Sequence, residues 1–372
     1  MPSVAFYISG HGFGHGSRQI EIINALGRRL PAAWRIVIRT AAARWLFDRT
    51  LTTPVVFLEG ASDTGVIQVD SVRLDEQATA HAAADFYRTL DQRSATEARI
   101  LLDHDVRLVV SDAPPLACSA AAQAGIPSVV ISNFTWDWIY SGYAEAFAAF
   151  APGAIEAIAT AYSSAAAGWR LPMHGGFETV PLLLDLPFVA RHAHPSHTRA
   201  RVFECLSIPA DRPVVLSSFG GYGLDGFDHS TLDCLQTWTV VITGREPATE
   251  LSKGIAYVNE ADMYDAGLRY EDLLAAVDVV ATKPGYGIIS ECVANDTAML
   301  YTSRGKFLEY DVMVREMPRV LRCQFLDLPA LLAGRWRDAL DAVLASPPAP
   351  VRPRTDGAEI TSLMIGAAAG IV

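Results

Sequence analysis

Short apolar segments alternate along the chain with longer amphipathic ones, which is the pattern of strand-helix-strand units in a parallel sheet. The short segments are rich in β-branched residues, as expected for strands that helices cover on both faces. In the first half we expect strands at Ser3–Ser9, Arg35–Arg39, Pro54–Leu58, Leu108–Ser111 and Ser128–Ser132. We expect helices at Arg18–Leu30, Ala41–Leu51, Asp75–Asp103 and Leu116–Ala124. This half is therefore predicted to be one doubly wound domain.

A second alternation follows a segment from Val180 to Pro213 that is rich in proline and histidine and suits a connection between domains. Its expected strands are Val214–Ser218, Thr239–Thr243, Ile255–Val258, Val277–Ala281 and Ala298–Tyr301. A proline-rich run then precedes one last helix, Asp356–Ala369, which we expect to cross back to the first domain. The sequence thus predicts an α/β fold with two Rossmann-like domains of parallel strands, residues 1–185 and 186–352, and a terminal helix within 353–372.

Length and composition agree with two domains, because 372 residues with 51% hydrophobic residues exceed the usual size of a single core. Two domains imply a cleft, the usual place for a ligand. The formal net charge of -11 argues against nucleic acid as a partner, since binding its phosphate backbone needs clustered basic residues. A small anion needs only a few local donors and stays possible.

Cysteine spacing and the N-terminal sequence bear on the compartment. The five cysteines are scattered without metal or redox spacing, which is typical of buried thiols in a reducing compartment. The N-terminal sequence lacks the basic and apolar regions of a signal peptide. The alanine-rich stretch from Ala144 to Gly168 is interrupted by charged residues, proline and glycine, so we expect a buried helix pair and no integral membrane segment. The expected location is the cytoplasm, and the oligomeric state is left open.

A glycine-rich turn follows the first strand in the sequence SGHGFGHGSR, which spans residues 9–18. Glycines allow a tight turn and a close approach to a ligand, and the helix start that follows offers free N–H groups. The alternating glycines differ from the dinucleotide fingerprint, and no acidic residue ends the second strand, so a dehydrogenase is disfavoured.

Two histidines in this turn, His11 and His15, are candidates for chemistry because the carboxyl end of a central strand faces the cleft. An imidazole placed there acts as a general base on an acceptor hydroxyl. The alternative is that either histidine only hydrogen-bonds loop backbone. A metal site is disfavoured because no third ligand is apparent. Phe13 lies between the two histidines and is a candidate, with His11, for acceptor contacts.

Asp112 closes another strand in VVSDAPPLAC, and the aromatic segment NFTWDWIY follows the next strand. A carboxylate at a strand end can orient a base histidine by accepting its second N–H. The alternative is that Asp112 caps the helix that begins near Pro114. Trp136 in the aromatic segment either lines an acceptor pocket or fills the core.

Two further loops in the second half carry the features of phosphate sites. The first, SSFGGYG, contains Phe219, Gly220 and Gly221 directly after a strand. The second, TKPGYGIISE, runs from a strand end through Lys283, Gly285, Tyr286 and Gly287 into a helix that carries Glu291. Free amides at such helix starts suit a diphosphate, whereas a carboxylate one turn inside suits the vicinal hydroxyls of ribose.

On these residues the sequence resembles the GT-B glycosyltransferases over nearly the whole chain. TKPGYGIISE looks like the donor motif of the peptidoglycan N-acetylglucosaminyltransferase and the small-molecule UDP-glycosyltransferases. GHGFGH, VVSDAPPLAC, NFTWDWIY and KPGYG are closer still to the glycosyltransferase-like half of plant L-arabinokinases. The galactokinase-type half of those proteins has no counterpart here, so sugar kinase activity is not implied.

The resemblance implies an acceptor-binding first domain and a second domain that binds a nucleotide sugar, by default UDP-linked. It implies that His15 is the base and Asp112 its partner, that the glycines of both loops contact phosphate, and that Glu291 binds ribose. Glu309 and Tyr310 fall where members hold the donor sugar. The usual Asp-Gln or Gln-Gln pair is replaced there, so the sugar is left open.

The resulting hypothesis is an inverting, metal-independent transfer of a hexosyl or N-acetylhexosaminyl group to a hydroxyl, with a nucleotide sugar as co-substrate and no further cofactor. Two alternatives remain. A nucleotide-sugar 2-epimerase would turn over its substrate without an acceptor. A non-catalytic nucleotide-sugar-binding module would bind without turnover.

Overall fold

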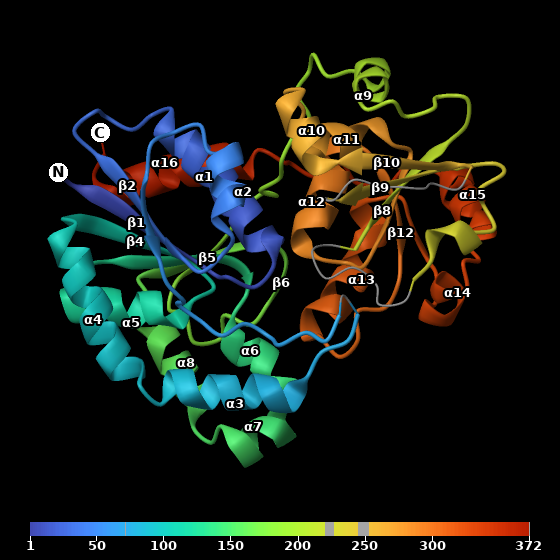
Figure 1. Cartoon of the computed structure of the whole chain (residues 1–372). Coiled ribbons are helices and arrows are strands. Elements are labelled where there is room, and N and C mark those ends of the chain that lie inside the picture. Colours follow the sequence, from blue (N-terminus) through green and yellow to red (C-terminus); the bar gives the residue numbers. More distant parts are fainter. Residues whose placement is uncertain (71, 220–226, 245–252, 372) are drawn as a thin grey trace.

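The computed structural model describes residues 1–70, 72–219, 227–244 and 253–371, which form two lobes side by side (Figure 1). The first lobe contains the strands and helices β1 (Ser3–Ile8), α1 (Phe13–Gly27), β2 (Arg35–Thr40), α2 (Arg44–Thr50), β3 (Val56–Glu59), α3 (Glu76–Tyr87), α4 (Leu90–Asp103), β4 (Val106–Asp112), α5 (Pro115–Ala124), β5 (Ser128–Phe134), α6 (Trp136–Ser141), α7 (Ala144–Phe150), α8 (Ala154–Ser163), β6 (Ala167–Gly175) and β7 (Leu183–Asp185).

The second lobe contains α9 (Arg199–Cys205), β8 (Val214–Ser218), the short 3-10 helix η2 (His229–Thr231), β9 (Thr239–Gly244), β10 (Ile255–Asn259), α10 (Glu260–Asp265), α11 (Tyr270–Ala276), β11 (Val279–Thr282), α12 (Tyr286–Asn295), β12 (Ala298–Tyr301), α13 (Leu308–Val320), β13 (Cys323–Phe325), α14 (Leu328–Leu332) and α15 (Arg337–Ala345). The last helix, α16 (Gly357–Ala369), returns to the first lobe and packs against α1.

Each lobe is built on one sheet whose named strands all pair in parallel. The first sheet has the order β3-β2-β1-β4-β5-β6-β7, and the second has the order β10-β9-β8-β11-β12-β13. The direction of winding reverses between β1 and β4 in one sheet and between β8 and β11 in the other. Ligands of doubly wound sheets bind at such switch points, outside the carboxyl ends of the strands. The predicted α/β fold with two Rossmann-like parallel sheets is confirmed.

Several sequence-based boundaries were wrong. The segment from Asp75 to Asp103 forms two helices, α3 and α4, because the chain leaves helical geometry at Thr89. Strands β6, β7 and β13 were missed; β7 and β13 are only three residues long, and β7 lies inside the segment expected to be a connection. The helix expected from Arg18 begins at Phe13, so His15 lies on the first turn of α1 rather than in a loop.

Candidate active site

The starts of two helices meet where the lobes face each other. Helix α1 begins at Phe13 and α12 at Tyr286, and the two helices pack together. A Cβ added to Gly287 would lie 3.2 Å from the Cα of Gly14, so glycine permits this approach. Neither helix has an acidic residue in its first turn or a side-chain cap. Two helix ends with unsatisfied N–H groups and partial positive charge thus point into one region.

His15 and Asp112 form a buried pair beside these helix starts. His15 Nδ1 lies 2.9 Å from Asp112 Oδ2, and the two residues are 6% and 0% exposed. The switch point brings His15 and Asp112 together, because Asp112 ends β4 opposite Ile8 of β1, and α1, which carries His15, follows β1. An ionised carboxylate only accepts hydrogen bonds, so Nδ1 carries the proton and Nε2 is the basic nitrogen.

Arg18 completes this cluster and was not assigned a role from the sequence. It lies three residues after His15, so both side chains share one face of α1. Its Nε donates to Asp112 Oδ1 at 2.9 Å, and its Nη2 also contacts Asp112 and lies 3.0 Å from His15 Nδ1. Its Nη1 donates to Asn133 Oδ1 at 2.6 Å. Burial acts to raise the pKa of Asp112, but Arg18 and then His15 outweigh it, and the pKa lies below its usual value.

Asp112 therefore acts as the partner of His15 and does not cap the following helix. The N-cap of α5 is Pro114, and no side chain caps that helix. The position of Arg18 could have been found from the sequence only if the start of α1 had been placed at Phe13, because the spacing of His15 and Arg18 gains meaning on a helix.

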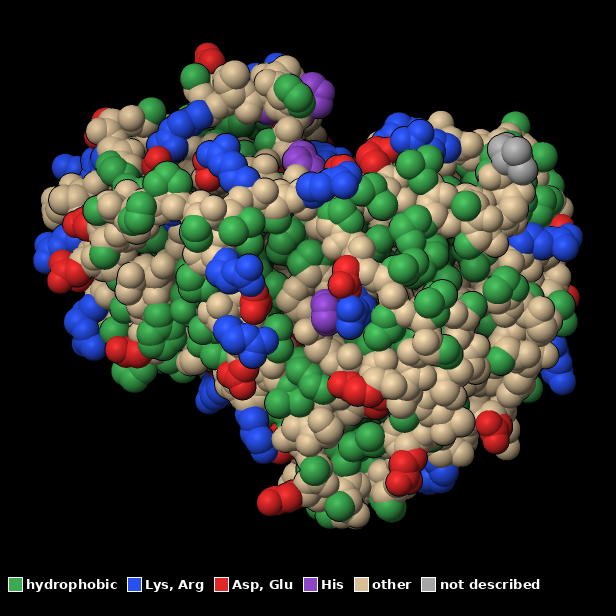
Figure 2. Space-filling view, turned by 180° about the vertical axis from the view of Figure 1, so that it is seen from behind, with side chains coloured by type: hydrophobic (Ala, Val, Ile, Leu, Met, Phe, Trp, Pro, Cys, Tyr) green, Lys and Arg blue, Asp and Glu red, His purple; other side chains and the backbone are tan. Residues whose placement is uncertain are grey.

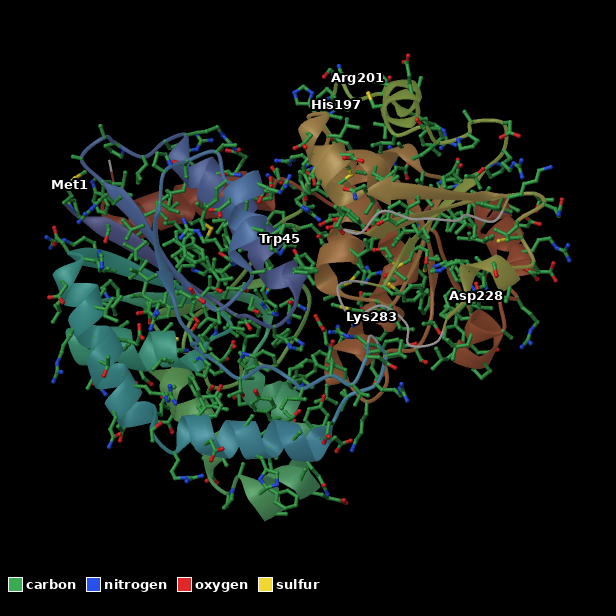
Figure 3. All side chains as sticks on the ribbon, viewed as in Figure 1. Met1, Trp45, His197, Arg201, Asp228 and Lys283 are labelled. Carbon is green, nitrogen blue, oxygen red and sulfur yellow. The ribbon has the colours of Figure 1, made fainter. Side chains whose placement is uncertain are left out.

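Positive charge also reaches this region from the second lobe. Lys283 follows β11, and burial together with the charge of Arg304 lowers the pKa of its ammonium to about 7. Among the described residues, no hydrogen bond or ion pair holds this ammonium. Figure 3 shows Trp45 on α2 and Lys283 on the sides of the two lobes that face each other.

Glu309, in the first turn of α13, bridges the lobes. It accepts from Asn133 Nδ2 at 2.7 Å and from Arg304 Nη1 at 2.8 Å. Since Asn133 in turn accepts from Arg18, one chain of hydrogen bonds joins the His15 cluster to the second lobe. Tyr310 beside it is half-buried.

Glu291 lies in a different cluster of buried charges. It is 3% exposed, and its Oε1 accepts from Arg191 Nε at 2.7 Å. Arg191 also lies 3.3 Å from Glu271, which is paired with Arg269. Burial raises the pKa of Glu291 to about 7, although Arg191 acts to lower it. The carboxylate expected to meet ribose is thus already engaged by an arginine from the segment that joins the lobes.

Comparison with known proteins gives the architecture a name. The crystal structure of the kitacinnamycin glycotransferase superposes with a TM-score of 0.62 at 16% identity, covering 98% of both chains. The calicheamicin glycosyltransferase CalG4 also reaches 0.62, at 17% identity, covering 99% of this chain and 98% of that one. The Phytolacca americana UGT2, solved with UDP-2fluoro-glucose and pterostilbene, reaches 0.58 at 12% identity over 99% and 95%.

The chain has the GT-B fold. L-arabinokinase of Arabidopsis thaliana is similar in sequence, 28% identical over 348 residues, which are 92% of this chain and 32% of the relative. This chain thus spans about a third of the length of the curated relative it matches. No family model matches the sequence.

Within this GT-B architecture the predicted acceptor residues divide into two groups. His11 and Phe13 lie at the start of α1, and Phe13 is 39% exposed beside Trp45. The imidazole of His11 stacks on Phe307 of the second lobe, with centroids 6.2 Å apart. Trp136, by contrast, is fully buried, and its Nε1 donates to Asp63 Oδ2 at 2.8 Å. Of the two alternatives for Trp136, the structure favours the second, because its indole fills the core of the first lobe.

The structure describes the two predicted phosphate loops to different extents. Gly285 is the N-cap of α12, and Tyr286 is buried with its hydroxyl accepting from Val189 N at 3.0 Å. Phe219 is buried at the end of the β8 segment. Gly220 and Gly221 lie outside the described residues, so their predicted phosphate contacts stay predictions.

Searched over the described part of the chain, the structure holds no group of three or more His, Cys, Asp or Glu that could bind a metal ion. None of the helices in those same ranges is long and apolar enough to cross a membrane. Figure 2 shows acidic and basic side chains interspersed over one face, with a notch between the lobes at its top.

Proposed function

We propose that the protein is a glycosyltransferase that moves a hexosyl or N-acetylhexosaminyl group from a nucleoside diphosphate sugar, by default a UDP-sugar, to a hydroxyl acceptor. The first lobe would bind the acceptor and the second the nucleotide. The observation that carries the proposal is the convergence of the uncapped starts of α1 and α12 beside the His15–Asp112 pair.

A diphosphate fits the charge of this region. Helix starts attract anions, and here two of them converge without an acidic residue in either first turn. The ammonium of Lys283 adds a cation that no described group neutralises by contact. These groups would stabilise the negative charge that develops on the departing nucleotide. We propose no metal requirement because this positive charge is already supplied by the chain.

His15 would activate the acceptor. Its Nε2 takes the proton of the acceptor hydroxyl while the acceptor oxygen bonds to the anomeric carbon. The bond from that carbon to the diphosphate oxygen breaks, and its electron pair leaves with the nucleoside diphosphate. Attack opposite the leaving group inverts the anomeric centre. Asp112 holds the imidazole through Nδ1 and stabilises its charged form, and Arg18 keeps Asp112 ionised.

The names of the neighbours support the choice of donor. One neighbour is described as a complex with UDP-2fluoro-glucose and another, VinC, as a complex with DTDP. A nucleotide-release assay tests the proposal with UDP-hexoses and UDP-N-acetylhexosamines, each with and without a panel of hydroxylated acceptors. Release of UDP that depends on an acceptor is expected.

A non-catalytic binding module is a second candidate, favoured by the engagement of Glu291 with Arg191. In that case UDP-sugars would bind by calorimetry, while no acceptor in the panel would promote release. Release without any acceptor would instead favour an epimerase or a hydrolase.

A further inference from the structure

A cavity of about 320 Å³ opens in the first lobe at His11. It is bounded by the turn after β1, the turn after β2 and the long connection between β3 and α3, and its walls include Gly10, His11, Ala41 and Asp63. The ring centroids of His11 and His15 are 6.3 Å apart. A molecule in this cavity would therefore contact His11, whose ring is a neighbour of the proposed base.

Two polar side chains of this cavity, His11 and Asp63, supply a donor and an acceptor. Burial, with the charges of His15, Arg304 and Lys283, lowers the pKa of His11 well below its usual value, so its ring is neutral. Its Nδ1 accepts from Val66 N at 3.3 Å, which leaves the proton on Nε2. Asp63 contributes a carboxylate that already accepts from Trp136. Such a pair suits hydroxyl groups, which both donate and accept.

A second cavity of about 470 Å³ adjoins the first, since Ala61 lines both. Its other walls include the side chains of Arg39, Gln92, Arg93, Thr96 and Glu97. Arg39 and Glu97 are paired with each other, so this wall offers polar groups whose charges are balanced. Of the described residues, no Phe, Tyr or Trp lines either cavity.

We infer that the two cavities form one acceptor groove that takes a hydroxyl-rich carbohydrate of two or more sugar units, with its reacting unit between His11 and Asp63; this inference rests on the proposed function. An apolar aromatic acceptor would need the predominantly apolar walls that most small-molecule pockets provide. In the first cavity the aliphatic side chains of Val66 and Ile67 are instead mixed with the polar side chains of His11, Asp63, Thr64 and Gln68. Here the large aromatic side chains Phe134, Trp136 and Tyr140 are at most 2% exposed.

The passage at Ala61 allows a test that leaves the core intact. Ala61 is exposed, so Ala61→Phe should place a phenyl ring where the two cavities meet. Ala33→Phe is the matched control, because Ala33 is also exposed but precedes β2 at the amino ends of the strands, whereas Ala61 follows the carboxyl end of β3.

Saturation-transfer NMR would compare an equimolar mixture of cellotriose, maltotriose and xylotriose with pterostilbene. We expect the wild type and Ala33→Phe to bind at least one trisaccharide, and Ala61→Phe to bind it roughly tenfold more weakly because the ring fills its path. Absence of trisaccharide binding to the wild type, or binding that Ala61→Phe leaves unchanged, would overturn the groove. Binding of pterostilbene alone would overturn it as well.

Calorimetry with UDP on the same proteins separates this inference from the proposed function. If UDP binds and the trisaccharides do not, only the groove assignment fails. If UDP fails to bind the wild type, the proposed function fails whatever the trisaccharides do.

Discussion

Two buried clusters of charge lie near the interface of the lobes, and both contain a residue that the sequence marked as functional. In the first cluster, Asp112 and Arg18 surround His15 but leave its Nε2 without a described protein partner. In the second, Arg191 takes Oε1 of Glu291 and also approaches Glu271.

Burial and charge therefore do not by themselves distinguish a residue that takes part in a reaction from one that stabilises the fold. The His15 cluster leaves one imidazole nitrogen without a described protein partner, whereas the Glu291 cluster binds the connection between the lobes to α12. Asn295 strengthens that attachment, because its Nδ2 donates to the Arg191 carbonyl at 3.0 Å. We therefore expect substitutions in the first cluster to act on turnover and those in the second to act on stability.

The largest effect is expected from His15→Ala. General-base catalysis contributes roughly 100-fold to 10,000-fold, so turnover should fall by that order. The affinity for UDP should hardly change, because the nucleotide would bind in the other lobe. Steady-state kinetics and calorimetry measure the two quantities. His81→Ala is the matched control, because His81 is an exposed histidine on α3 that lines neither cavity. Full turnover in His15→Ala would show that His15 is not the base.

A smaller loss of the same kind is expected from Asp112→Asn. The amide keeps the shape of the side chain but no longer stabilises a charged imidazole, and an orienting partner is worth about 10-fold to 100-fold. The maximal rate should fall more than the apparent affinity for either substrate. A change confined to the melting temperature would contradict the orienting role.

Lys283→Met should weaken UDP binding by about tenfold, the low end for a hydrogen bond to a charged group. The pKa of Lys283 is lowered to about 7, so its ammonium is lost as the pH rises through 7. A bound diphosphate would favour the charged form. Wild-type affinity should therefore fall as the pH rises above about 7, with up to one proton taken up per UDP bound. Lys283→Met should lose this dependence in calorimetry.

The smallest effect on UDP is expected from Glu291→Gln, about 0.5 kcal/mol or roughly twofold, because Arg191 already engages the carboxylate. Its effect on stability should depend on pH. Because the pKa of Glu291 is raised to about 7 in the folded protein, the folded state binds more protons than the unfolded state below that pH. The contribution of this group to stability thus decreases as the pH rises from its unfolded pKa to about 7, and then stays constant.

Thermal melts from pH 4.5 to 8 measure that dependence. Glu291→Gln should flatten the profile relative to the wild type. A large loss of UDP affinity in a protein with an unchanged melting profile would return Glu291 to the role of ribose ligand that the sequence resemblance implies.

The sequence predicted the fold well where strands are long and apolar. It predicted β1, β4, β8 and β11, and with them the switch points at which His15 and Lys283 lie. It missed β6, β7 and β13, which lie at or next to an edge of their sheets, since short or mixed strands lack a clear pattern of apolar residues. It also placed the start of α1 too late, because glycines usually mark a loop.

The partners of the site residues could not be predicted. Arg18, Asn133 and Glu309 meet only because α1, β5 and α13 converge, and these residues are far apart in the sequence. The pairing of Arg191 with Glu291 likewise depends on how the connection between the lobes folds back on α12. Pattern and spacing carry no information about such contacts.

A crystal structure of the protein with UDP tests the central claim most directly. We expect the diphosphate to accept hydrogen bonds from the backbone N–H groups at the start of α12 and from Lys283 Nζ, with His15 Nε2 facing the terminal phosphate. UDP bound away from α12, or a diphosphate that Lys283 does not contact, would contradict it.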